Sequence, residues 1–184
     1  GLAQPQERYP EALALYRRSV ASAPGRQNAQ YNLGNLLVSV GRSDEAVEHL
    51  REAVRIWPEF AVAHEILGHA YRNLGEAELS LQAFQRSVEI DPDAPNAQYN
   101  LGVALLRLGR PQQALGPFGE ALRLQPDLTP ALIGLGDAHA ALGDRESALG
   151  AFQRALLLAR DQGDLELARQ IGNHLEQVRD ARSR

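Results

Sequence analysis

The sequence contains few residues of the types that catalyse reactions or bind metals, and their spacing does not fit known catalytic or metal-binding motifs. His64-Glu65 followed by His69 invites comparison with the helical zinc motif of metalloproteases. That motif needs its two histidines four residues apart, because this spacing puts both on one face of a helix. Here they are five residues apart. We therefore predict no metal site at this position.

Other candidates also read as structural. Asp91-Pro92-Asp93 pairs two carboxylates, but Asp beside Pro is typical of a turn that precedes a helix. Gly134-Leu135-Gly136 does not follow a predicted strand and matches no phosphate-binding loop. His139 falls where related segments have an apolar core residue, so we expect it to pack half-buried. His49 and His174 stand alone in the sequence.

The absence of cysteine removes disulfides, thiolate nucleophiles and cysteine metal sites together. No grouping of Ser, His and Asp emerges from the spacing either. We therefore predict no catalytic residue, no metal ligand and no cofactor, and we expect the chain not to be an enzyme.

Composition indicates a soluble, folded protein, with 44% hydrophobic and 23% charged residues. The formal net charge is −4, and no basic run could follow a phosphate backbone, so nucleic acid is not an expected partner. No apolar stretch approaches the ~20 residues of a membrane span. All basic residues other than His are Arg, which favours a GC-rich bacterial genome and leaves cytoplasm and periplasm both open. Gly1-Leu2-Ala3-Gln4 is neither an initiator methionine nor a signal sequence, and we interpret it as a processed or cut start.

Self-similarity at a fixed spacing decides the architecture. Pro24, Pro58, Pro92 and Pro126 stand 34 residues apart. Several other features keep the same register: a Leu-Gly pair, a glycine seven residues after it, a small residue, a large apolar residue four positions later, and another small residue. The Leu-Gly pairs are Leu33-Gly34, Leu67-Gly68, Leu101-Gly102 and Leu135-Gly136, and the large apolar residues are Leu50, Phe84, Phe118 and Phe152.

This pattern resembles the tetratricopeptide repeat family over roughly residues 7 to 160. The family's large aromatic residue before Leu-Gly is replaced here by Gln30, His64, Gln98 and Leu132. The resemblance implies an all-α fold, a right-handed superhelical solenoid of antiparallel helix pairs. Apolar residues at i, i+4 and i+7, as in Leu67, Tyr71 and Leu74, independently predict an amphipathic first helix in each repeat.

The register divides the chain into segments. We predict helix pairs at 27–40 with 43–56, 61–74 with 77–90, 95–108 with 111–124, and 129–142 with 145–159, since a glycine ends each first helix and a proline follows each second helix. The predicted segments are the second helix of an incomplete N-terminal repeat at 1–24, full repeats at 25–58, 59–92, 93–126 and 127–160, and a polar capping helix at 161–184.

Function is predicted from the face of each first helix that lies opposite its core stripe. This face mixes apolar and aromatic residues with Asn, His and Arg, whereas a face exposed only to water would be charged; the apolar and aromatic residues are Tyr31, Tyr99, Val103, Leu106 and Ile133. The family resemblance places it on the concave inner surface, where peptides or a partner's helix bind. Asn32 and Asn100 match inward asparagines of the O-linked glycosyltransferase type of these repeats, although solvated asparagines remain the alternative. The predicted partner-binding residues are Asn28, Tyr31, Asn32, Asn35, Glu65, His69, Arg72, Asn96, Tyr99, Asn100, Val103, Leu106 and Asp137.

The leading hypothesis is therefore a non-catalytic scaffold that binds a partner peptide or helix in its groove. The alternative is a substrate-recognition arm of a larger enzyme, of glycosyltransferase or sulfotransferase type, whose catalytic domain lies outside this chain. Self-association is a third possibility, through the N-terminal half repeat, where a missing first helix would leave Leu13 and Val20 uncovered. The apolar stripe could also serve tighter curvature or contact with another domain.

Overall fold

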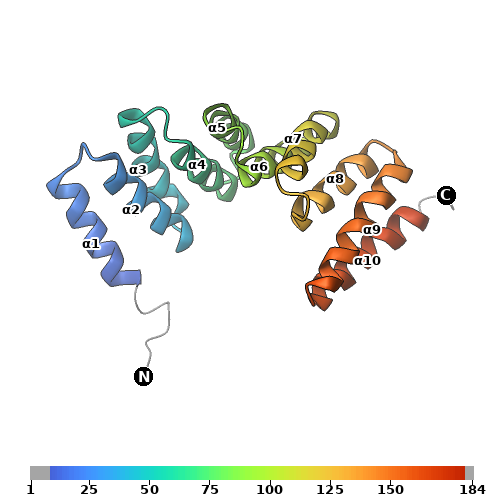
Figure 1. The fold of residues 1–184 in the computed structure, drawn as a ribbon. Coiled ribbons are helices and arrows are strands. Elements are labelled where there is room, and N and C mark those ends of the chain that lie inside the picture. Colours follow the sequence, from blue (N-terminus) through green and yellow to red (C-terminus); the bar gives the residue numbers. More distant parts are fainter. Residues whose placement is uncertain (1–8, 181–184) are drawn as a thin grey trace, which may run out of the picture. The chain divides into compact units, whose positions relative to one another are not determined.

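The computed structural model describes residues 9–180, and this part of the chain consists of α-helices joined by short turns, without any strand (Figure 1). Residues 1–8 and 181–184, which belong to the predicted first and last segments, lie outside the described residues. The helices are α1 (Tyr9–Ser22), α2 (Gln27–Ser39), α3 (Ser43–Ile56), α4 (Ala61–Asn73), α5 (Ala77–Ile90), α6 (Pro95–Arg107), α7 (Pro111–Leu124), α8 (Thr129–Ala141), α9 (Arg145–Asp161) and α10 (Leu165–Asp180).

The predicted all-α repeat architecture is confirmed, and helix ends agree with the predicted ones to within two residues. Each first helix (α2, α4, α6 and α8) ends one residue earlier than predicted. Gly41 and Gly75, which follow α2 and α4, both have a φ of +79°, a conformation that side chains with a Cβ rarely adopt. Helix α9 runs two residues further than predicted, to Asp161, because no proline follows the fourth repeat.

The chain divides into two compact units, with the division between Pro92 and Asp93. The first unit contains two antiparallel hairpins, α2 with α3 and α4 with α5; α1 packs on α2, and α3 packs on α4. The second unit contains the hairpins α6 with α7 and α8 with α9; α7 packs on α8, and α10 packs on α9. Each unit is thus a stack of helical hairpins.

One contact recurs inside every hairpin. A large apolar side chain of the second helix lies against the Leu-Gly glycine of the first helix. A Cβ added at Gly68 would lie 2.7 Å from Cε1 of Phe84, and one at Gly136 would lie 2.7 Å from Cε1 of Phe152. Real Cβ atoms do not approach so closely, so the glycine is required for the two helices to pack at this separation. The four pairs are Gly34 with Leu50, Gly68 with Phe84, Gly102 with Phe118 and Gly136 with Phe152.

Helix α10 covers the end of the second unit. Its apolar stripe, Ala168, Ile171 and Leu175, is buried in one cluster with Phe152 of α9. Its other faces carry polar residues.

Replacing Phe84 with Ala should lower the free energy of unfolding by about 3 to 5 kcal/mol, since Phe84 is 1% exposed and the site cannot close around the lost ring. Gly68→Leu should cost at least about 1 to 3 kcal/mol through overpacking against the same ring. Chemical denaturation measures both. Leu79→Ala on the same helix, at a position 41% exposed, is the control and should change stability by about 0.5 kcal/mol or less. If Phe84→Ala and Leu79→Ala changed the free energy of unfolding equally, Phe84 would not be a core residue.

Candidate protein-binding surface

The predicted binding residues lie on the first helices, and their exposure differs widely. Those on α2 are exposed apart from Tyr31, and those on α4 are half-buried. Helix α6 presents one exposed, three half-buried and one buried residue. The exposed residues are Asn28, Asn32, Asn35 and Asn96; the half-buried ones are Tyr31, Glu65, His69, Arg72, Tyr99, Val103, Leu106 and Asp137; the buried one is Asn100.

In the first unit the structure adds two aromatic residues to Tyr31. The ring of Tyr31 lies 5.0 Å from that of Phe60, centroid to centroid, and Phe60 stacks on Trp57 at 4.7 Å. We call Tyr31, Trp57 and Phe60 the aromatic cluster. The Trp57 side chain is 44% exposed, so the cluster forms part of the surface. Val62, two residues after Phe60 in the sequence, is 46% exposed.

Sequence reasoning missed Trp57 and Phe60 because both lie in the turn between α3 and α4. A signal for them does exist in the repeat register. The position of Trp57 is occupied by Asp91 and Gln125 in the other repeats, and that of Phe60 by Ala94 and Leu128. Neither position is aromatic in the repeats that contain Asp91 and Gln125, so Trp57 and Phe60 depart from the pattern, and such departures mark residues that the fold does not need.

The electrostatics of this surface centre on Tyr31. Burial raises the pKa of the Tyr31 hydroxyl above its ordinary value, and the negative charge of Glu65 raises it further. The effect of Glu65 shows that α2 and α4 bring these two predicted residues into electrostatic contact. At neutral pH the Tyr31 hydroxyl is therefore a neutral hydrogen-bonding group.

His69 has a packing role in addition to its place on this surface. Its Nε2 lies 3.8 Å from Oε1 of Glu65, one helical turn earlier. Its ring stands edge-on to Phe84, with the centroids 5.1 Å apart. His69 therefore touches the core ring of its own hairpin, and its replacement would affect packing as well as binding.

Asn100 does not lie on the open surface that the sequence analysis assigned to it, since its exposure is only 6%. Gly134 occupies the same place in the next repeat, and a Cβ added there would lie 2.5 Å from Cε1 of Phe118, which belongs to the preceding hairpin. At Gly134, this register position therefore faces the preceding hairpin of the second unit. Asn32 in the first repeat is exposed.

In the second unit the predicted residues form a less polar surface. The ring of Tyr99 lies 6.2 Å from that of Phe118, and Val103 and Leu106 are half-buried on the same helix. Asp137 on α8 is partly covered by α10, since Oδ1 of Asp137 lies 3.6 Å from Nδ1 of His174. Burial raises the pKa of the Asp137 carboxyl, and His174 opposes that rise.

His139 is half-buried, as predicted, and its Nδ1 lies 3.1 Å from Oδ2 of Asp144 at the start of α9. This contact joins the end of α8 to the turn that follows it. Its partner is a helix-capping carboxylate, because Oδ1 of Asp144 also accepts a hydrogen bond from the backbone N–H of Ser147. We therefore interpret the His139–Asp144 pair as a structural contact.

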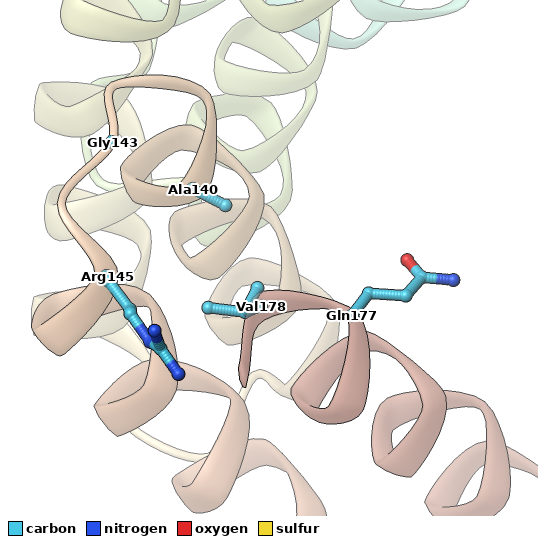
Figure 2. Close-up of a pocket in the computed structure, with 5 residues that line it drawn as sticks. All are labelled: Ala140, Gly143, Arg145, Gln177 and Val178. Carbon is cyan, nitrogen blue, oxygen red and sulfur yellow. The ribbon is translucent and has the colours of Figure 1, made fainter. Parts of the chain in front are cut away.

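A cleft of about 370 Å³ lies between the α8–α9 turn and α10 (Figure 2). The side chains of Ala140 and Val178 point toward it, and Gln177 points away. Among the described residues that line the cleft the one charged side chain is Arg145, whose Nη2 donates a hydrogen bond to the carbonyl oxygen of Arg179 at 2.6 Å. These lining residues include no acid, base or nucleophile that could support catalysis.

Two further properties concern residues 9–180 as a whole. In this range no three His, Asp or Glu side chains are grouped so that they could hold a metal ion. None of the helices described there has both the length and the apolar character required to cross a membrane.

The electrostatic contact between Tyr31 and Glu65 can be tested by titration. Tyr31 should deprotonate above its ordinary pKa of about 10, and Glu65→Gln should lower the value without restoring it fully, because burial remains. Since the folded chain favours the protonated hydroxyl, the stability that Tyr31 contributes is complete below about pH 10 and is lost as the pH rises through its folded-state pKa. Carbon-13 NMR of labelled tyrosine reports the titration, and Tyr31→Phe identifies the signal. Glu48→Gln on α3 is the control; an equal shift with both variants would exclude the contact.

Comparison with known proteins agrees with this architecture. A family model described as tetratricopeptide repeat matches residues 2–59 and 99–164, and a TPR repeat model matches residues 68–109. The TPR repeat-containing thioredoxin TTL4 of Arabidopsis thaliana is 44% identical over 57 residues, which is 31% of this chain; the chain spans only 8% of that protein's length.

Solved structures extend the likeness to most of the chain. A crystal structure of MamA superposes with a TM-score of 0.81 at 23% identity, covering 86% of this chain and 93% of MamA. The structure of YrrB, described as a TPR protein with an unusual peptide-binding site, gives a TM-score of 0.77 at 26% identity and covers 91% of this chain and 84% of YrrB. The hairpin register, the family models and these likenesses agree that the chain belongs to the tetratricopeptide repeat family.

Proposed function

We propose that this protein is a non-catalytic interaction scaffold that binds a partner peptide or helix on the outward faces of its first helices. The observation that carries the proposal is the aromatic cluster of Tyr31, Trp57 and Phe60. The fold does not require aromatic rings at positions 57 and 60, because the equivalent turn positions in other repeats hold Asp91 and Gln125, and Ala94 and Leu128. A half-exposed Trp beside two further rings is instead a suitable anchor for a partner's apolar side chain.

The groups around the cluster support a peptide ligand. Asn28 and Asn35 are exposed on α2, the same helix as Tyr31, and their amides can both donate to and accept from a peptide backbone. An apolar centre with a polar rim is the usual composition of a protein interface. The first unit therefore offers an anchor together with backbone-binding groups.

The second unit carries a comparable arrangement on α6. Tyr99, Val103 and Leu106 are half-buried there, and Asn96 is exposed at its start. Membership of the tetratricopeptide repeat family supports the proposal, since proteins of this family serve as protein-interaction scaffolds. YrrB, whose description names a peptide-binding site, is a neighbour with similar coverage of both chains.

The alternative function, a recognition arm of a larger enzyme, retains one supporting observation. The relative from Arabidopsis thaliana is named a TPR repeat-containing thioredoxin, and this chain spans 8% of it. Repeats of this kind therefore occur in the same chain as another type of domain. The reading frame that surrounds residues 1 and 184 in the genome decides between the two functions, since the alternative requires a catalytic domain in the same frame.

The proposed function predicts that tyrosine replacement lowers affinity without unfolding the chain. Peptides are selected from a random display library on the immobilised wild-type chain, and their affinities are measured by calorimetry. For a peptide held at one of the two surfaces, Tyr31→Ala with Tyr99→Ala should lower the affinity about 30-fold, since a hot-spot tyrosine contributes about 2 kcal/mol. The matched control is Leu79→Ala with Leu157→Ala, which removes two exposed apolar side chains from second helices and should leave the affinity unchanged.

Thermal melts accompany these measurements. Equal affinities in the tyrosine variant and the control would place peptide binding elsewhere and refute the proposal. A large fall in melting temperature for the tyrosine variant alone would show that Tyr31 and Tyr99 belong to the core, because both rings also touch phenylalanines, Phe60 and Phe118.

A further inference from the structure

Hydrogen bonds fix the turn that carries two rings of the aromatic cluster. The backbone N–H of Trp57 donates to the carbonyl oxygen of Ala53 at 2.9 Å, and that of Phe60 donates to the carbonyl oxygen of Trp57 at 3.2 Å. Across the turn, Nε2 of His64 donates to the carbonyl oxygen of Pro58 at 2.9 Å. These bonds hold the two rings in place before a ligand binds, which lowers the entropy lost when a side chain docks on them.

The stacking of the cluster leaves part of its tryptophan open. Phe60 lies between the other two rings, and its plane is inclined by only 27° to that of Trp57. Phe60 therefore covers one face of the indole, and the exposed 44% of the Trp57 side chain lies away from that face. Among aromatic rings, the face of an indole attracts a cation most strongly.

Negative charge surrounds these rings. The carboxylate of Glu65 acts on the Tyr31 hydroxyl, which places it close to one end of the cluster. Glu59 lies in the turn itself and accepts a hydrogen bond from Arg86 at 2.6 Å, while Arg86 also donates to Glu89 at 3.1 Å. One positive and two negative side chains in this group leave a net negative charge beside the turn. The C-terminal end of α3 adds a partial negative charge from its carbonyl groups.

Two basic residues lie within four sequence positions of the cluster, and neither offsets this charge. The guanidinium of Arg55 donates two hydrogen bonds to the carboxylate of Glu52, each 2.7 Å long. Burial lowers the pKa of the His64 imidazole, so this ring is neutral at neutral pH. The arginine of α4, Arg72, follows Glu65 by seven residues and is therefore about 10 Å further along the helix. The surroundings of the rings are thus suited to a cation.

The second unit lacks these features at the same register positions. Tyr99 corresponds to Tyr31, but the position of the carboxylate is apolar and neither turn position is aromatic. The residues that stand 68 positions after Trp57, Phe60 and Glu65 are Gln125, Leu128 and Ile133. The two tyrosine surfaces therefore share a position in the repeat but differ in the ligand chemistry that they favour.

We propose that the aromatic cluster binds an arginine side chain of the partner peptide, with the guanidinium stacked on the rings and its charge balanced by Glu65 and Glu59. This inference rests on the proposed function and names the anchor residue of that peptide. The methylene stem of arginine supplies the apolar contact, and its planar, weakly hydrated guanidinium both stacks on flat rings and pairs with carboxylates. A purely apolar anchor would cover the rings without bringing a charge to balance the carboxylates as water is displaced.

The site can be tested with a small probe, because Trp57 is the one tryptophan in the sequence and its indole N–H gives a single NMR signal. N-acetyl-arginine amide is titrated into the full 184-residue chain, and a saturable shift of this signal is expected. The uncharged isostere, N-acetyl-citrulline amide, should bind about 2- to 30-fold more weakly, which is the range that a cation–π contact contributes. N-acetyl-lysine amide should also bind more weakly than the arginine probe, because its ammonium is more strongly hydrated.

Chain variants test the two parts of the site. Glu65→Gln should lower the preference for arginine over citrulline at least about twofold, whereas Glu48→Gln, which removes the same charge from an exposed position of α3, should leave it unchanged. Trp57→Leu keeps an apolar side chain but should weaken arginine binding to the level of citrulline. In this variant the Tyr31 ring, labelled with carbon-13, reports binding. The Tyr99 ring should not respond to the arginine probe in any of these chains.

Equal binding of the arginine and citrulline probes to the wild-type chain would overturn the proposal. Lysine binding as tight as that of arginine would overturn the choice of arginine, and equal responses of Tyr31 and Tyr99 would show that the probe does not recognise the cluster.

The peptides selected from the display library separate this inference from the proposed function. Those whose affinity falls with Tyr31→Ala alone should contain an arginine, and its replacement by citrulline should weaken them about 2- to 30-fold. Peptides that depend on Tyr99 instead should show no such requirement. Peptides that depend on Tyr31 but contain no arginine would overturn this inference and leave the proposed function intact. If neither tyrosine affected any peptide, the proposed function would fall and the inference about its anchor with it, whatever the small probes showed.

Discussion

The close approach of a large side chain to a glycine is the contact on which the rest of this structure depends. Phe84, Phe118 and Phe152 each lie where a Cβ on the facing helix would sit within 3 Å of the ring. The contact sets the separation of the two helices in a hairpin. Once that separation is fixed, the turn that joins the helices is short, and its glycine adopts a positive φ. Each hairpin therefore packs as one unit. Successive hairpins can stack because each has the same packing surfaces as the one before.

Stacking determines which faces of each helix remain available for function. A first helix uses one side for its own second helix, and the register position of Gly134 shows that it uses another for the preceding hairpin. Each first helix therefore keeps only a narrow strip that no other helix covers. Tyr31 lies on that strip of α2, and Tyr99 on that of α6.

Much of this could be predicted from sequence because the interactions that define it are local or periodic. Helix ends follow from glycine and proline at fixed places, and the buried phenylalanines follow from the register. The burial of Asn100 could not be predicted in the same way. Periodicity within one helix separates its apolar stripe from its polar side, but it does not tell which polar positions become buried in the folded chain. His69 shows the same limit, since its contact with Phe84 depends on the distance between helices rather than on its place in one helix. The aromatic cluster was missed for another reason, because Trp57 and Phe60 lie in a turn, outside any helical period.

The distribution of charge supports the assignment of binding to the first helices. Many exposed ion pairs of the described chain form within second helices or the last helix, three residues apart, as in Glu52 with Arg55 and Glu120 with Arg123. Exposed pairs of this kind contribute at most about 1 kcal/mol each, so they keep these faces solvated rather than holding the fold together. Desolvating such a pair would also be unfavourable for a partner, because two charges would lose their water. The aromatic cluster carries no comparable penalty: its rings lose contact with water on binding, which is favourable, and the Tyr31 hydroxyl is uncharged at neutral pH. A partner therefore gains most binding free energy on the faces where aromatic rings and amides are exposed and few charges are present.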